Sequence, residues 1–259
     1  MRDNFKNIEY FNLLIEKIEN SIDRQLKKID NCLIKKDRIA PVKMQISLSY
    51  IRIFRAMYSR GDDMDSTEVA NLYEKMIKFW CESRVNSRLQ MITFTKKRNI
   101  IDLDQYTFSG YLDLLDLLSI GFLIEASTSH FNMIANIITK DKVKDYLVNF
   151  LLKSKLDGIT SISEESYSDQ NYMHVNQRLG SLKDIIFNNN IEVAQRDLEL
   201  FLEKKWYNSL KGTGYYDQHN NPNNTYSGYW CFVAAAIAKI KGLDDSSFRD
   251  NKYYPKDLV

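Results

Sequence analysis

Apolar residues recur at spacings of three and four along most of this 259-residue chain, whereas residues that interrupt helices are rare. Only nine glycines and three prolines are present, and strand-rich folds need such turn residues at short intervals. Spacings of three and four place apolar side chains on one face of an α-helix. We therefore predict an all-α fold of antiparallel helical hairpins, packed as one or two subdomains. A solenoid-like array of these hairpins is an open alternative.

The first third of the chain has the longest amphipathic patterns. They predict a first helix over Asn4–Lys36 and a second helix that Pro41 opens at its first position, where its missing N–H is not needed. The two helices would form a hairpin ending near Gly61. A third helix is expected from the cap at Ser66 to about Met91.

The last quarter of the chain contains two of the three tryptophans and two of the three prolines. Its apolar run predicts a helix over Tyr226–Lys241, and a helix that is apolar on nearly every face is normally buried. A glycine follows it and can end it in the left-handed conformation, and an aspartate can cap a short helix after that. We expect structural roles for Trp206, Gly228, Trp230, Gly242 and Asp244.

The only candidate for acid–base chemistry is the pair Asp217 and His219, two residues apart in an aromatic loop. No serine or cysteine nucleophile stands in a recognisable turn nearby, so we interpret both residues as structural. All three histidines are isolated, and no Cys-x-x-Cys or nucleotide-binding glycine motif is present. We therefore expect no catalytic residue, no metal and no cofactor.

Charge and hydropathy limit the partners and the compartment. The formal net charge is +2, and neither half is basic enough to bind nucleic acid by charge alone. The longest apolar runs, Leu117–Ile124 and Cys231–Ala238, are far shorter than the roughly 20 residues that span a bilayer. The N-terminal residues lack a secretory cleavage site, and the three cysteines are widely spaced. We expect a cytoplasmic protein that contacts neither membrane nor nucleic acid.

Two clusters of acids stand out. The stretch Asp157–His174 has four acids and no lysine or arginine. A solvated linker is its simplest interpretation, and a partner-binding surface is the alternative. A second, smaller cluster precedes the third predicted helix. The acids of the two clusters are Asp157, Glu164, Glu165 and Asp169, and then Asp62, Asp63 and Asp65.

The block from Trp206 to Val259 resembles a known family. Its dense string of residues falls in the order seen in the C-terminal region of the PoNi proteins, which are bacterial immunity proteins that neutralise the PoNe class of DNase toxins. The residues that carry this resemblance are Trp206, Tyr216, Asp217, His219, Tyr226, Gly228, Tyr229, Trp230, Ala234, Ala235, Ala236, Gly242, Leu243, Asp244, Asp245, Tyr253, Tyr254 and Pro255. The N-terminal half resembles the PoNi N-terminal region in layout only. The resemblance implies two helical regions, 1–138 and 139–259.

This resemblance implies a non-enzymatic inhibitor that binds the DNase domain of a toxin delivered by an interbacterial secretion system. A helical scaffold unrelated to toxins, and an enzyme built on the loop of His219, are the alternatives. A DNase presents a basic groove, so an inhibitor gains association rate and specificity from acidic surfaces. We therefore expect the two acidic clusters to contact the toxin. Self-association remains open.

Overall fold

The computed structural model describes residues 1–84, 90–96, 99–141, 145–160 and 169–259. It confirms the all-α class and adds one β-hairpin within these residues. The α-helices are α1 (Ile8–Asp30), α2 (Lys36–Arg60), α3 (Thr67–Arg84), α4 (Phe108–Leu123), α5 (Thr128–Lys140), α6 (Tyr146–Lys153), α7 (Asp169–Phe187), α8 (Ile191–Leu200), α9 (Trp206–Ser209) and α10 (Phe232–Lys241). No helix of the described residues is long and apolar enough to cross a membrane.

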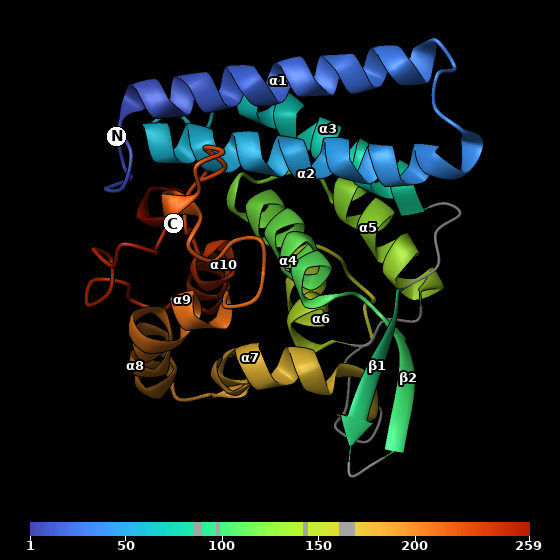
Figure 1. Ribbon diagram of the computed structural model, residues 1–259. Helices are drawn as coiled ribbons and strands as arrows, with labels where there is room; N and C mark the ends of the chain where they lie inside the picture. The colour runs from blue at the N-terminus through green and yellow to red at the C-terminus, as the bar shows by residue number, and fades with distance from the viewer. Residues whose placement is uncertain (85–89, 97–98, 142–144, 161–168) are drawn as a thin grey trace.

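Helices α1, α2 and α3 form one side of the molecule (Figure 1), and α2 packs against both of the others. The buried stripe of α1, which includes Phe11, Ile15 and Ile22, faces α2 as its spacing predicts. The predicted end of the first helix at Lys36 and the predicted start of the second helix at Pro41 were both wrong. Helix α1 ends at Asp30, and α2 begins at Lys36 with Pro41 inside its second turn. Proline has no N–H to bond the carbonyl of Asp37 four residues earlier, so α2 lacks one hydrogen bond near its start.

A β-hairpin follows α3 and projects away from the helices (Figure 1). Strands β1 (Gln90–Lys96) and β2 (Asn99–Gln105) pair antiparallel, with Gln90 opposite Gln105. The prediction that the third helix continues to Met91 was therefore wrong, since the described part of α3 ends at Arg84.

Helix α4 lies in the middle of the molecule and is buried on nearly every face. It packs against α10 from the other end of the chain, and also against α2, α5, α6 and α7. One continuous hydrophobic core runs from α1 to the C-terminal segment. Because α4 and α10 are distant in sequence, the helices enclose a shared core and do not stack only on their sequence neighbours. The division into regions 1–138 and 139–259 stays a prediction, since this core crosses it.

The C-terminal quarter departs from the expected single helices. A π-helical segment, Phe201–Lys205, separates α8 from α9. Helix α10 begins at Phe232 instead of Tyr226, and the residues from Tyr226 to Cys231 form no regular secondary structure. Gly242 ends α10 in the left-handed conformation, with φ +63°, but turns follow in place of the expected short helix. Short 3₁₀ segments lie at Gln218–Asn220 and Lys256–Leu258.

Candidate functional site

The segment from Trp206 to Trp230 is fixed to the N-terminal half by buried hydrogen bonds. Trp206 Nε1 donates to the carbonyl of Tyr229 at 2.7 Å, and Trp230 Nε1 donates to Oγ of Ser59 at 2.7 Å. Both indoles are buried, and Trp230 meets the ring of Tyr58 edge-on with centroids 4.8 Å apart. The large aromatic groups thus tie α9 to the irregular segment before α10, and that segment to the end of α2.

Gly228 lies where this segment is in close contact with α2. Its φ is +118°, and a Cβ there would be 2.4 Å from Nε1 of Trp230 and 2.6 Å from Oγ of Ser59. Glycine is therefore required for both the conformation and the close contact. Near the other end of α10, Asp244 accepts a backbone N–H two residues further on at 3.0 Å, and this hydrogen bond lowers the pKa of its carboxyl group.

A buried polar cluster joins α2, α4 and the aromatic loop. Arg55 donates to Oδ2 of Asp116 from Nη2 at 2.5 Å and from Nε at 3.0 Å, and its Nη1 donates to the carbonyl of Gly228 at 3.2 Å. Tyr215 Oη donates to Oδ1 of Asp113 at 2.5 Å. The cluster therefore holds two carboxyl groups and one guanidinium. When both acids are ionised, it carries one excess negative charge.

Burial raises the pKa of Asp113 to about 7. The hydrogen bond from Tyr215 and the charge of Arg55 lower it, whereas neighbouring Asp116 raises it further. The folded state thus binds a proton at Asp113 more tightly than the unfolded chain does. The stability that this proton supplies is complete below the unfolded pKa near 4 and is lost as pH rises through about 7.

We expect Asp113→Asn to flatten the dependence of stability on pH, because asparagine does not titrate and its oxygen can still accept from Tyr215. Between pH 4 and pH 8, the free energy of unfolding of the variant should rise relative to that of the wild type by about 3–4 kcal/mol. Urea unfolding across this range measures the difference. Asp184→Asn, at an exposed position of α7, is the control and should follow the wild-type curve. Parallel curves for wild type and Asp113→Asn would contradict this assignment.

The structure places His219 in contact with its own loop and with the residues that precede α1. Its Nδ1 is 2.8 Å from Oη of Tyr229 and 3.8 Å from Oδ1 of Asp217, and its ring lies 4.7 Å from the ring of Phe5. Asp217 has a left-handed backbone, with φ +57°. These contacts can hold the loop against the residues that precede α1. Within the described residues, no three His, Cys, Asp or Glu side chains lie close enough together to hold a metal ion.

The three cysteines are free thiols. Cys81 and Cys231 are buried, and burial raises the pKa of Cys81 to about 12 and also raises that of Cys231. The thiolate, which is the nucleophilic form, is disfavoured at both positions. Cys32 is exposed just after α1.

The smaller acidic cluster lies beside a concave pocket. Asp63 and Asp65 are exposed in the turn between α2 and α3, and Oδ1 of Asp63 accepts the N–H of Asp65 at 3.1 Å. A pocket of about 340 Å³ is lined by three acids, Asp65, Glu125 and Asp257, and by Lys239, Ser66 and apolar residues. The fold therefore brings acids from three separate parts of the chain, and one lysine, to one hollow of the surface.

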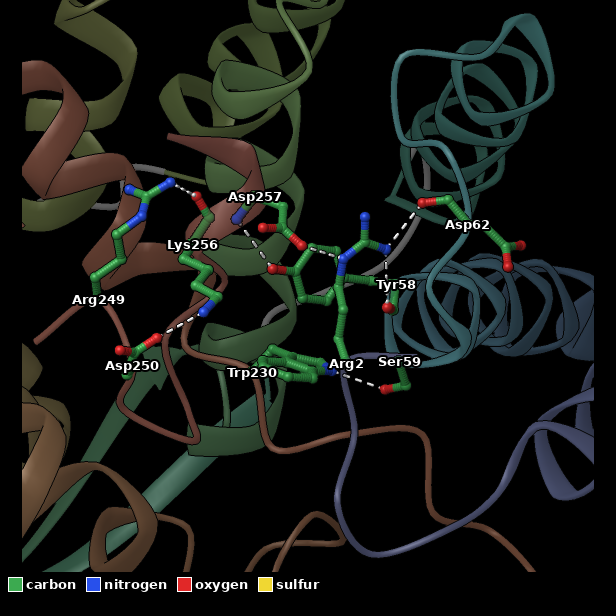
Figure 2. Close-up of polar contacts among 9 residues, drawn as sticks. All are labelled: Arg2, Tyr58, Ser59, Asp62, Trp230, Arg249, Asp250, Lys256 and Asp257. Atoms are coloured by element: carbon green, nitrogen blue, oxygen red, sulfur yellow. Dashed lines mark hydrogen bonds and ion pairs between the residues drawn. The ribbon is translucent and has the colours of Figure 1, made fainter.

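Asp62 differs from its neighbours because its charge is compensated. Arg60 donates to its two carboxylate oxygens at 2.8 and 2.6 Å. Figure 2 shows the backbone of the same residue accepting from Arg2, at 2.8 Å, while Arg2 also donates to the carbonyl of Tyr58 and pairs with Asp257. Asp62 thus helps to fasten the two ends of the chain to α2.

The larger acidic cluster is described only in part. Asp157 is exposed in the turn after α6, and it does not line the pocket beside Asp65. Asp169 is the first residue of α7, so the linker predicted over Asp157–His174 is helical from that point. Glu164 and Glu165 lie outside the described residues.

Sequence reasoning missed the buried polar cluster. Asp113 and Asp116 stand within the strongly apolar α4, and Arg55 stands within the buried stripe of α2. Charged residues inside buried helices are normally paired. The presence of such residues within apolar helical patterns could therefore have indicated the cluster. The partner loop containing Tyr215 is far away in sequence, so its contribution could not be read from spacing.

These features define a helical protein with a buried polar cluster at its centre and an acidic pocket on its surface. The chain belongs to the family of PoNe immunity proteins. The model of the PoNi N-terminal region matches residues 2–136, and the model of the PoNi C-terminal region matches residues 143–258. It is thus an immunity protein against PoNe nuclease toxins. No curated protein and no solved structure matched the chain.

Proposed function

We propose that this chain neutralises a PoNe-class DNase toxin by binding it one to one, without chemistry of its own. The observation that carries the proposal is the match to both PoNi regions, which together extend over nearly the whole chain. We place the interaction in the cytoplasm of the protected cell, because that is where the DNA substrate of such a toxin lies. The free thiols of the three cysteines are consistent with this compartment.

The proposed contact surface has two parts. Asp63 and Asp65 are exposed beside a pocket that is lined by Asp65, Glu125, Asp257 and Lys239. Of these acids, Asp257 is already paired with Arg2. A basic side chain from a DNA-binding groove would be attracted to this hollow, and neutralising several such charges would compete with DNA. Asp62 is expected to contribute least, because Arg60 already pairs with it at 2.6 Å. The second part is the cluster of Asp157, Glu164, Glu165 and Asp169.

We expect charge reversal to weaken toxin binding at both parts of this surface without unfolding the chain. One variant carries Asp63→Lys and Asp65→Lys, and the other carries Glu164→Lys, Glu165→Lys and Asp169→Lys. Rim charges act mainly on association rate and salt dependence, so each variant should associate more slowly, by about tenfold at low salt. Surface plasmon resonance against the nuclease domain of the toxin encoded beside this chain measures both quantities.

The matched control reverses two exposed acids elsewhere, Glu192→Lys and Glu203→Lys near α8. It changes the net charge by as much as the first variant and should bind like the wild type. Equal slowing of the control and the test variants would mean that net charge matters and the proposed surface does not. Failure of the wild type to rescue cells that express the toxin would overturn the proposed function itself.

A further inference from the structure

A second cavity opens between α2, the end of α3 and the start of α4. Its volume is about 420 Å³, within the range of ordinary ligand pockets. Met44, Leu48 and Trp80 give it apolar walls, and Asp113 is the one acid among the described residues that line it, with 7 % of its surface exposed. The cavity therefore combines an apolar wall with a carboxyl group that is almost removed from water.

The charge of Asp113 is incompletely matched inside the protein. Among the described residues, its one hydrogen bond comes from Oη of Tyr215 at 2.5 Å. The only guanidinium of the cluster, Arg55, directs both Nε and Nη2 to Asp116. Buried carboxylates are normally paired with a cation as well as hydrogen-bonded. Asp113 lacks that cation, although it lines a cavity large enough to admit one.

The other charges at this cavity do not supply the missing cation. Arg84 also lines it, but Nη2 of this arginine lies 2.6 Å from Oδ2 of Asp141, and Tyr106 Oη donates to the same oxygen at 2.8 Å. The ion pair of Arg84 and Asp141 therefore carries no net charge. One excess negative charge therefore remains at the cavity when Asp113 is ionised.

We propose that this cavity receives one lysine or arginine side chain from the nuclease domain of the toxin, whose cation pairs with Asp113. This inference rests on the proposed function, because it takes the toxin as the partner. A long basic side chain suits the cavity well. Its methylene stem can pack against Met44 and Trp80, while its charged end replaces the missing counter-ion. A DNA-binding groove provides several such side chains.

The test measures the affinity for the same nuclease domain by isothermal titration calorimetry. Asp113→Asn removes the charge but keeps an acceptor for Tyr215, and it should weaken binding on the order of 30-fold or more, as loss of a buried charge pair does. Ala40→Trp fills the cavity from its half-buried wall without touching the polar cluster, and it should weaken binding to a similar extent. Thermal unfolding checks that both variants are folded.

Asp184→Asn is the matched control, because it removes the same charge from an exposed position on α7, and its affinity should stay within about twofold of wild type. Wild-type affinity in Asp113→Asn, or in folded Ala40→Trp, would overturn the cavity assignment while leaving the proposed function intact. Absence of binding by the wild-type chain would instead overturn the proposed function.

Discussion

Trp230→Asp is expected to abolish the native packing of the C-terminal quarter. The indole is 4 % exposed, its Nε1 donates to Ser59 at 2.7 Å, and its ring packs edge-on against Tyr58. Aspartate would lose these contacts and place a charge where no free cation lies among the described neighbours. A large cavity combined with an uncompensated buried charge belongs to the most damaging class of substitutions. The free energy of unfolding should fall by about 5 kcal/mol or more.

Urea unfolding followed by circular dichroism measures this loss, if the variant remains folded enough to purify. Trp230→Phe is the matched control, because it keeps an aromatic ring and introduces no charge, although it loses the hydrogen bond to Ser59 and part of the buried ring volume. It should cost about 1–3 kcal/mol. A Trp230→Asp variant with an unchanged melting temperature would contradict the buried position of the indole.

Arg55→Met is expected to destabilise the chain by about 3–5 kcal/mol, because it leaves Asp116 as a buried charge without a partner. Although burial opposes the charged form of Arg55, the carboxylate of Asp116 raises the pKa of this guanidinium above its usual range. Two backbone carbonyls, those of Gly228 and Trp230, also lose their donor. The substitution therefore releases α4 and the aromatic loop from α2 together.

The double variant Arg55→Met with Asp116→Leu separates charge from packing. Replacing a buried ion pair by apolar residues of similar volume is often close to neutral, so the double variant should recover most of the stability lost in Arg55→Met. Chemical unfolding of the wild type, the two single variants and the double variant gives the coupling energy. Additive losses in the four proteins would show that the two side chains act independently, against the geometry of the cluster.

The helices were predictable where a single periodic pattern decides the structure. The burial of α4 and the end of α10 at Gly242 follow from apolar spacing and from the left-handed preference of glycine. The β-hairpin was not predicted. Its two strands are separated in sequence by Lys97 and Arg98, which are not the Asn-Gly or Asp-Gly residues that mark a tight turn.

The irregular stretch before α10 was missed because its backbone is fixed by partners distant in sequence. Tyr226, Tyr229 and Trp230 continue the apolar run of α10, so the pattern alone extends the helix to them. In the fold, the carbonyls of Gly228 and Trp230 accept from Arg55, so they are bound by a side chain of α2 instead of by helical N–H groups. Tertiary contacts of this kind override local helical preference.

The candidate binding surface was predictable only in outline. Counting acids locates Asp63 and Asp65, but it cannot show that Arg60 compensates Asp62, nor that Glu125 and Asp257 complete the same hollow. The family match over residues 2–136 and 143–258 identifies the class of partner. The residues that meet the partner stay proposals, and the variants described above test them.

The most direct measurement of the central claim titrates DNA cleavage by the isolated nuclease domain against increasing amounts of this chain. A stoichiometric inhibitor that binds tightly predicts a linear fall in the cleavage rate to background at one equivalent, together with a one-to-one complex in light scattering. Cleavage that persists at excess inhibitor would contradict the account. So would complete inhibition at a small fraction of an equivalent, because that result would require the chain to turn over.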